Sequence, residues 1–378
     1  MSSGGATLQG SFSGATGTIY ETGFYYGTSS GNLDHHATGD GTNASSGDFE
    51  CTITSLDAST TYYYKAYVLE YNESTSSYEE RYGSVLSFTT EAQAAPQPAG
   101  WLELPTYTAS AMSGTTTSSL SDLYYLKHSA TMGGRTQRNY TCLYDPEMYA
   151  SYWVAYPLCY DHINGSGRSN QWAYDPDVPT AKQTNCTAGA YGVYLDTENY
   201  TNNYYSRGHQ IANADRNGVD DMCDQTYYMT NITPQLQNGF NGGVWNNLET
   251  AVQNLTSSCD TVYVVTGAAF RKKTIGTESI TTIVNSRDSK TLPVPNYYWK
   301  ALLKVTWSGS TVTAASAIGF WLPHQDLKGA DYADYAVSVD QIEAWTGFDI
   351  FANLPGDNSS GIEKTAEANT SWTSFQSF

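Results

Sequence analysis

The chain has 378 residues, which is enough for two domains that each bury a core, and its formal net charge is −19. A protein that holds nucleic acid on a broad basic surface is positively charged, so this composition argues against a sequence-specific DNA-binding regulator. The charge argues only mildly against a nuclease, because a few local arginines and a divalent cation can hold a polyanion. No run of about 18 apolar residues occurs, so we expect no transmembrane helix.

The N-terminus and the cysteines bear on the compartment. Residues 1–10 show neither the basic nor the apolar segment of a signal peptide, so we expect none in this chain. The abundance of Tyr, Thr, Ser, Asn and Gly favours a secreted, periplasmic or cell-surface protein. The six cysteines form no Cys-x-x-Cys pair, which disfavours a zinc ribbon. Five of them follow residue 100, so at most two disulfides can form there unless Cys51 bridges the domains, and their pairing stays open.

Residues 1–92 consist of strand-like segments separated by turn residues. The expected strands are Thr18–Tyr26, Asp48–Leu56, Thr61–Tyr71 and Tyr82–Thr90. Short alternating strands at this spacing predict an all-β sandwich. The segment Leu56–Tyr62 also resembles the tyrosine corner of fibronectin type III domains, with Ala58 where that family usually has proline. The resemblance implies a seven-stranded spacer or docking module without catalytic chemistry.

Residues 93–100 form a linker of small residues and prolines, and a second domain is expected at 101–355. The tail at 356–378 is expected to be loosely ordered, although Trp372, Phe375 and Phe378 could dock on the surface. The second domain has a mixed, α+β pattern. Its expected strands are Tyr152–Leu158, Gly192–Leu195, Thr226–Thr230, Thr261–Thr266, Tyr298–Trp307 and Val312–Trp321. A helix is predicted over Gly239–Leu255, and a short one begins near Val337–Glu343 and ends at Gly347.

The tripeptide Arg207-Gly208-His209 is the first candidate for chemistry. An isolated histidine is usually structural, but His209 follows an arginine and precedes a metal-compatible segment within about 30 residues. A neutral imidazole can take a proton from water near pH 7, which is the task of a general base. Arg207 supplies a planar, permanently charged group that matches two phosphate oxygens.

The expected helix at Gly239–Leu255 carries a candidate metal ligand. Asn241 near its start would by default be a helix cap, whereas as a ligand its carbonyl oxygen suits the hard ions Mg²⁺ or Ca²⁺. Glu249 lies eight residues on, about 80° round an ideal helix, where it can hold a water that a metal also binds. The alternative for Glu249 is an exposed helix carboxylate.

Two further residues complete the predicted site. Asn231 precedes Ile232-Thr233-Pro234, where proline is expected to end a strand, so Asn231 either satisfies the turn or orients His209 or the phosphate. Arg168 is a second candidate cation for the phosphate, and its assignment rests mostly on resemblance.

Taken in this order, these motifs resemble the DNA/RNA non-specific endonuclease family of the ββα-metal, or His-Me finger, type. The resemblance covers about residues 101–355, and further matches are Tyr152–Tyr156, Val265–Gly267, Pro295–Lys300 and Val339–Glu343. It implies an α+β nuclease domain with an antiparallel sheet, preceded by the fibronectin III-like sandwich. Two departures stand out: Ser206 replaces the family's usual Asp before Arg-Gly-His, and the interval from Arg168 to Trp172 is longer than usual.

The resemblance implies a function and a role for each residue. His209 would be the general base, Asn241 the direct ligand of Mg²⁺ (Mn²⁺ or Ca²⁺ in the same site), and Glu249 the holder of water at the metal. Asn231 would support the site, and Arg207 and Arg168 would stabilise the phosphate. The product would be DNA or RNA cut to 5′-phosphate ends with little sequence selectivity, because the contacts go to phosphate and sugar.

Two rival functions remain at the level of sequence. One is a phosphodiesterase that acts on small nucleotides through the same centre. The other is a surface adhesion or docking protein whose nuclease-like domain is inactive, against which the intact set Arg207, His209, Asn241 and Glu249 argues. The sequence leaves open the oligomeric state, the preference for DNA or RNA, and any surface partner of the N-terminal sandwich.

Overall fold

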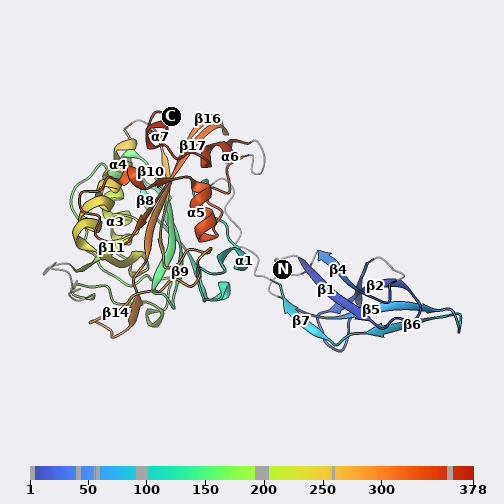
Figure 1. Ribbon diagram of the computed structural model, residues 1–378. Coiled ribbons are helices and arrows are strands. Elements are labelled where there is room, and N and C mark those ends of the chain that lie inside the picture. The colour runs from blue at the N-terminus through green and yellow to red at the C-terminus, as the bar shows by residue number, and fades with distance from the viewer. Residues whose placement is uncertain are drawn as a thin grey trace. The chain divides into compact units, whose positions relative to one another are not determined.

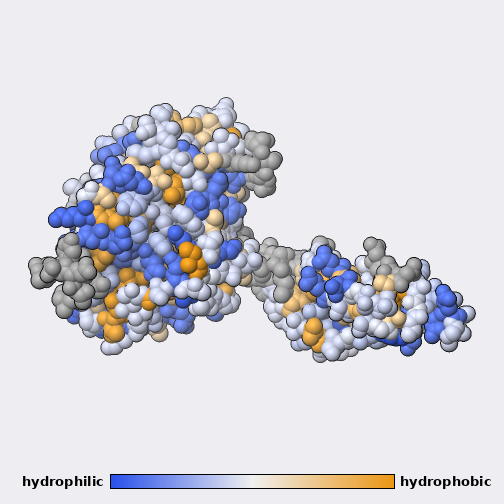
Figure 2. Space-filling view, viewed as in Figure 1, coloured by the Kyte–Doolittle hydropathy of each residue, from blue (hydrophilic) through white to orange (hydrophobic). Residues whose placement is uncertain are grey.

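The computed structural model describes residues 5–39, 44–54, 56, 60–90, 101–191, 204–257, 260–355 and 361–378. The chain divides into two compact units, one comprising Met1–Ala94 with Thr108–Ser110, the other Ala95–Tyr107 with Ala111–Phe378 (Figure 1). The expected linker at 93–100 and the expected strand Gly192–Leu195 lie outside the described residues. Hydrophilic residues cover much of the visible face of both units, and hydrophobic residues form small separate groups there (Figure 2).

The first unit consists of antiparallel strands in two sheets. β1 pairs with β4, and the second sheet has the order β3-β2-β5-β6, with β7 also paired to β5. Alternate side chains such as Leu8, Phe24 and Ile53 point into one apolar core, as expected for strands with one face covered. Three expected strands are confirmed, β1 and β3 were not predicted, and the segment Tyr82–Thr90 is split between two strands. The bounds are β1 Gly5–Ser13, β2 Thr18–Gly27, β3 His35–Gly39, β4 Ser46–Thr54, β5 Thr61–Asn72, β6 Ser77–Tyr82 and β7 Leu86–Thr89.

A seven-stranded antiparallel sheet of order β18-β17-β16-β13-β10-β9-β8 forms the centre of the second unit. Its middle strands are apolar on both sides because both faces are covered: Val154 and Tyr156 of β10 enter one core, and Trp153 and Ala155 enter the other. The expected strands in β10, β13, β16 and β17 are confirmed. The bounds are β8 Tyr124–Met132, β9 Arg135–Asp145, β10 Ala150–Leu158, β13 Val262–Ala269, β16 Tyr297–Ser308, β17 Thr311–Pro323 and β18 Ala336–Val337.

Helices cover the two faces of this sheet (Figure 1). Helix α4 (Asn246–Leu255) packs on one face through Leu248 and Val252, together with α7 (Trp372–Gln376). Helix α5 (Val339–Thr346) packs on the other face through Ile342, together with α6 (Ile362–Glu367). The prediction of α5 is confirmed: Ser338 caps its first turn, and Gly347 ends it with a φ of 79°.

β11 (Tyr205–His209) and β12 (Ile232–Leu236) pair with each other in a small two-stranded sheet. Both strands come before α4 in the chain. Pro234 is inside β12, so the expectation that proline ends the strand is wrong; β12 pairs on one side only, which leaves room for a residue without an N–H. The strand expected at Thr226–Thr230 is also wrong. That segment follows α3 (Asp220–Gln225) as a turn and the 3₁₀ helix η4 (Met229–Asn231).

The predicted helix Gly239–Leu255 is regular only from Asn246 onward. Residues Gln237–Trp245 form an irregular turn, in which Gly239 has a φ of 74° and Gly243 also departs from helical angles. A Cβ at Gly239 would lie 2.7 Å from Cγ of Asp326, so close approach as well as the positive φ requires glycine there. Apolar residues at helical spacing continue through this segment, which explains the wrong boundary.

The remaining elements are short, and the tail is more ordered than expected. Phe375 of α7 is fully buried, as the alternative of docking aromatic residues allowed, and the helices α6 and α7 show that residues 361–378 are more regular than a loosely ordered tail. No disulfide joins Cys51, Cys142, Cys159, Cys186 and Cys223, the described cysteines. Among the described residues, no helix is both long and apolar enough to cross a membrane. The other bounds are α1 Ala109–Met112, α2 Tyr160–Ile163, β14 Thr282–Val284, β15 Thr291–Pro293, and the 3₁₀ helices Leu120–Asp122, Thr180–Lys182, Asn213–Asp215 and Tyr332–Tyr335.

Candidate active site

A cleft of about 790 Å³ in the second unit collects most of the predicted site residues. β11, the irregular turn and α4 form its walls, together with the loop that precedes Trp172. Five of the six predicted residues line it: Arg168, Arg207, His209, Asn241 and Glu249. Asn231, the sixth, is not part of the lining.

His209 is the last residue of β11, where pairing with Ile232 of β12 holds its backbone. Its ring packs 4.9 Å from the Tyr227 ring and 5.5 Å from the Trp172 ring, measured between centroids. One side of the imidazole makes a hydrogen bond with the Arg207 backbone, while Nε2 is buried and has no hydrogen-bond partner among the described residues. A ring anchored at one nitrogen and open at the other is the arrangement that a general base requires.

The surroundings of His209 keep its imidazole neutral. Burial lowers the pKa of His209 to about 3, and the positive charges of Arg168 and Arg207 add to that effect. The neutral form accepts a proton, so the ring is in the correct state for a base throughout the physiological range. A bound phosphodiester carries negative charge, and it therefore opposes both arginines and raises the pKa of His209 toward its ordinary value.

Gly208 lets β11 approach β12. A Cβ at this position would lie 2.5 Å from Cδ of Gln235, which is buried on the facing strand. Any larger residue would push the two strands apart and displace the neighbouring His209. The close packing of β11 against Gln235 therefore explains why the Arg-Gly-His tripeptide has glycine at its centre.

Two arginines bring positive charge to the cleft. The guanidinium carbon of Arg207 lies 3.7 Å from the centroid of the Trp172 ring, a cation–π contact that fixes the side chain. Burial is the largest cause of the lowered pKa of Arg207. Arg168, which is exposed at the cleft wall, lowers that pKa further through its positive charge. Trp172, which sequence reasoning did not assign, thus positions one arginine and contacts the histidine as well.

Asn231 is fully buried behind His209 and stabilises the backbone that follows it. Its Nδ2 donates to the carbonyl oxygens of Ile211 (3.0 Å) and Thr226 (2.7 Å). Its Oδ1 accepts from the N–H of Ile211 at 3.0 Å. Of the two alternatives that the sequence left open, these contacts match a residue that satisfies the local backbone.

Asn241 lies in the irregular turn before α4, so it does not cap a helix, and the angle of about 80° to Glu249 does not apply. Its Nδ2 donates to Oγ of Ser206 and, at 3.3 Å, to Oε1 of Gln237. Ser206 also donates to the carbonyl oxygen of Gln235 at 3.2 Å. With both protons of the amide directed at these two acceptors, Oδ1 of Asn241 is left as the group that can bind a ligand in the cleft.

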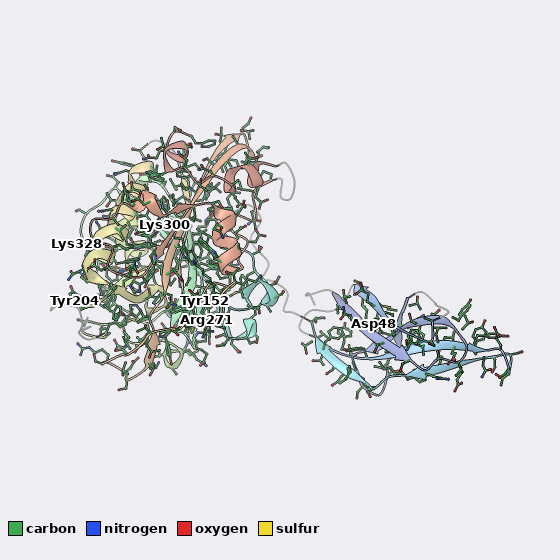
Figure 3. The ribbon with its side chains drawn as sticks, in the orientation of Figure 1. Asp48, Tyr152, Tyr204, Arg271, Lys300 and Lys328 are labelled. Atoms are coloured by element: carbon green, nitrogen blue, oxygen red, sulfur yellow. The ribbon has the colours of Figure 1, made fainter. Side chains whose placement is uncertain are left out.

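Glu249 lies in the first turn of α4 and has a raised pKa of about 7. Burial is the main cause, the positive charge of Lys300 opposes it, and the negative charge of Asp215 adds to it. Lys300 is buried on β16 within the body of the second unit (Figure 3). Tyr204, which lines the cleft, lies at the margin of that unit in the same view.

Sequence reasoning missed the polar residues behind Glu249. Asp215 accepts hydrogen bonds from Tyr156 (2.6 Å) and from Gln253 of α4 (2.8 Å). Two signals were available: Gln253 is four residues after Glu249 and so shares its helix face, and Lys300 lies among apolar residues in the first half of a strand. The position of Asp215 has no comparable signal in the sequence.

A second group of potential metal ligands, His128, Asp175 and Asp177, lies outside the lining of the cleft. Nε2 of His128 is 3.1 Å from Oδ2 of Asp175, and Thr230 donates to the same carboxylate at 2.7 Å. The His128–Asp175 pair is buried, and Asp175 also accepts from the backbone N–H of Asp177 at 3.1 Å, so we interpret the pair as a structural contact.

The cleft thus combines a neutral imidazole, two arginines, a carboxamide oxygen and a carboxylate. This set defines the class of protein as a hydrolase that acts on phosphate esters. The sequence profile of the DNA/RNA non-specific endonuclease family matches residues 121–357. The chain belongs to this family and is a nucleic-acid-hydrolysing enzyme.

Two relatives by sequence are named nucleases. The chain is 30% identical over 219 residues to a nuclease of Serratia marcescens, which covers 56% of this chain and 72% of that protein. It is 24% identical over 230 residues to mitochondrial nuclease 1 of Schizosaccharomyces pombe, covering 59% of this chain and 67% of that protein. A crystal structure of the EndoG/EndoGI complex aligns at 21% identity and a TM-score of 0.46, covering 61% of this chain and 87% of that chain.

Proposed function

We propose that the protein is a Mg²⁺-dependent, largely sequence-non-specific endonuclease that cuts DNA, RNA or both to 5′-phosphate ends through a His-Me finger site. The observation that carries the proposal is the unpartnered Nε2 of His209, whose residue lines the same cleft as Asn241 and Glu249. β11, β12 and α4 would be the two strands and the helix of the ββα motif. The family profile and the named nucleases support nucleic acid as the substrate.

The donor set suits a divalent cation of the hard type. Oδ1 of Asn241 is an oxygen donor, and Ser206 and Gln237 hold the amide by its nitrogen. Glu249 can hold water at such an ion once it is ionised, and its raised pKa makes that depend on pH. A bound cation would supply positive charge to the phosphate and to the leaving oxygen. Mn²⁺ and Ca²⁺ suit the same oxygen donors.

The chain's own groups perform the remaining tasks. His209 accepts a proton at Nε2 from the attacking water, and its hydrogen bond with the Arg207 backbone keeps the ring oriented. Arg207, held on Trp172, and Arg168 bind phosphate oxygens and stabilise the charge that accumulates in the transition state. Asn231 acts as a positioning residue, because its contacts reach only backbone groups.

The chemistry of the cleft accounts for low sequence selectivity. Its cations are suited to phosphate, which is identical at every step of a nucleic acid, whereas selectivity requires contacts with base edges. With a net charge of −19, the protein relies on the two arginines and the cation to overcome repulsion from its substrate.

The first unit would be a fibronectin III-like accessory module, with domain boundaries at 1–92, 93–100, 101–355 and 356–378. Its seven strands in two antiparallel sheets support this proposal, and the family profile begins only at residue 121. We propose a secreted, periplasmic or cell-surface location, in which the module binds a surface partner.

Plasmid cleavage tests the proposed function. We expect the full chain with Mg²⁺ to degrade supercoiled and linear DNA, and EDTA to stop the reaction. His209→Ala should lower the rate by roughly 10²–10⁴-fold, the usual contribution of a general base. His36→Ala, an exposed histidine of the first unit, is the matched control and should retain full activity. Intact plasmid with the wild type would refute the proposal, and hydrolysis of small phosphodiesters alone would favour the phosphodiesterase.

A further inference from the structure

A second concentration of acidic groups lies on the opposite face of the sheet from the cleft, between α5 and α6. Asp340 and Glu343 are three residues apart, so they share one face of α5. Glu367 is the last residue of α6. Both helices pack beside β17, where Figure 1 shows them near each other. One carboxylate oxygen from each of the three residues lies within 4.8 Å of those of the other two.

Glu367 supplies the observation that points to a ligand. Its side chain is 96% buried, and Oε1 has no hydrogen-bond partner among the described residues. Burying a carboxylate without a partner is costly, and such groups are normally paired or bound to a metal. None of the ion pairs among the described side chains involves Asp340, Glu343 or Glu367.

The neighbours of Glu367 make the cost greater. Burial raises the pKa of Glu367 to about 10, and the charges of Glu343, Glu363, Asp340 and Asp349 raise it further, so the carboxyl holds a proton at pH 7.5. Burial likewise raises the pKa of Glu343 to about 8, although the N–H of Ile350 donates to its Oε1 at 2.6 Å. A bound cation would displace these protons and stabilise the ionised carboxylates.

We propose that Asp340, Glu343 and Glu367 form a second binding site for a divalent cation, separate from the cleft, and that the ion is Ca²⁺. The donors are all carboxylate oxygens, without a histidine or cysteine, which disfavours Zn²⁺ and favours a hard ion. Ca²⁺ binds oxygen at about 2.4 Å, so two ligands of one ion lie at most about 4.8 Å apart, as observed here. Its flexible coordination also tolerates ligands from two helices better than the strict octahedron of Mg²⁺.

Occupation of this site would attach the C-terminal segment to the body of the domain. α6 supplies the buried ligand and α5 the other two, so the ion links residues 339–346 to residues 362–367. The described part of α6 is only six residues long, and a helix of that length is marginal without tertiary support. Ca²⁺ would therefore act as a structural clamp, with no direct part in hydrolysis.

The test uses the full chain stripped with a chelator and titrated with Ca²⁺ alone, followed by calorimetry and thermal unfolding. We expect saturation to raise the Tm by about 5 °C at a concentration of roughly one hundred times Kd. In an Asn241→Ala background, which removes the proposed ligand in the cleft, Glu367→Gln should abolish this shift. It should also raise the Tm of the Ca²⁺-free protein at pH 7.5, because folding then no longer requires the buried carboxyl of Glu367 to take up a proton. Opposite effects with and without Ca²⁺ would not follow from a merely destabilising substitution.

Three further variants keep the test decisive. Asp340→Asn, at an exposed position that tolerates substitution, should lower the affinity for Ca²⁺ about tenfold or more with the fold intact. Glu147→Gln, an exposed glutamate elsewhere, is the matched control and should respond as the wild type does. Asn241→Ala removes the proposed ligand in the cleft together with any Ca²⁺ binding there, and it should keep a Ca²⁺ shift that depends on Glu367, whether or not the enzyme shows nuclease activity. No shift in the wild type, or an equal shift in Glu367→Gln, would overturn the proposal.

Discussion

Replacing Lys300 with methionine isolates the electrostatic control of Glu249. The ammonium group of Lys300 is buried and opposes the effect of burial on the Glu249 carboxyl, whose pKa is about 7. Methionine fills a similar volume without charge, so Asp215 and burial then act unopposed on Glu249. An opposite charge at close range typically shifts a pKa by about 1–3 units, so we expect the pKa of Glu249 to rise to about 8 or above.

The magnitude of the effect on activity follows from the ionised fraction. If ionised Glu249 is required, half of the enzyme is competent at pH 7, and a pKa of 8 reduces this to about 9%. The variant should therefore lose about fivefold in kcat/KM at pH 7 and regain near-wild-type activity at pH 9.

The assay is the pH profile of kcat/KM on a fluorescent oligonucleotide duplex with saturating Mg²⁺. Lys304→Met is the matched control, because Lys304 is also buried, lies four residues further along β16, and contacts the Phe375 ring instead of the cleft network. The control should keep the wild-type acid limb. An unshifted acid limb in Lys300→Met, or an equal shift in Lys304→Met, would refute the assignment of that limb to Glu249.

Three other variants have defined outcomes. Glu249→Gln should lose activity together with the acid limb near pH 7. The pKa of Glu249 is raised on folding, so the contribution of this carboxyl to stability is complete below about pH 4.5 and is lost as the pH rises through about 7. The Tm of the Gln variant should therefore increase relative to the wild type as the pH rises through that window. A difference in Tm that does not depend on pH would contradict the raised pKa. Asn231→Ala removes three hydrogen bonds to buried backbone groups and should lower the free energy of unfolding by about 2–4 kcal/mol in urea denaturation, whereas a loss below about 1 kcal/mol would disprove its bracing role. Gly208→Ala should destabilise the fold and inactivate the enzyme through contact with Gln235, and Gln235→Ala should partly rescue it in a double-mutant cycle; additive effects would rule out the contact.

Prediction from sequence succeeded where the signal is local. The strands β10, β13, β16 and β17 are apolar runs bounded by turn residues, and α5 carries its own cap and terminator. Arg207 and His209 are two residues apart in one strand, so the motif alone places them together.

Prediction failed where distant residues decide the local conformation. Gly239 departs from the helix because Asp326, far along the chain, occupies the adjacent space. Phe375 is buried in a core of the second unit, whereas the sequence indicated only that it could dock from a loosely ordered tail. In both cases the free energy comes from tertiary contacts, which outweigh the intrinsic preference of a short segment.

The sequence alone therefore determined the family and placed the proposed base and the arginine beside it in one strand, because strand pattern and a short motif encode them within a few residues. The tertiary structure decided the rest of the site. It placed the amide of Asn241 on Ser206 and directed Asn231 at the backbone after His209. It also brought Lys300 and Asp215, from separate elements, near Glu249, where their opposing charges set its pKa. Burial and charge act through space, so no local pattern in the sequence records them.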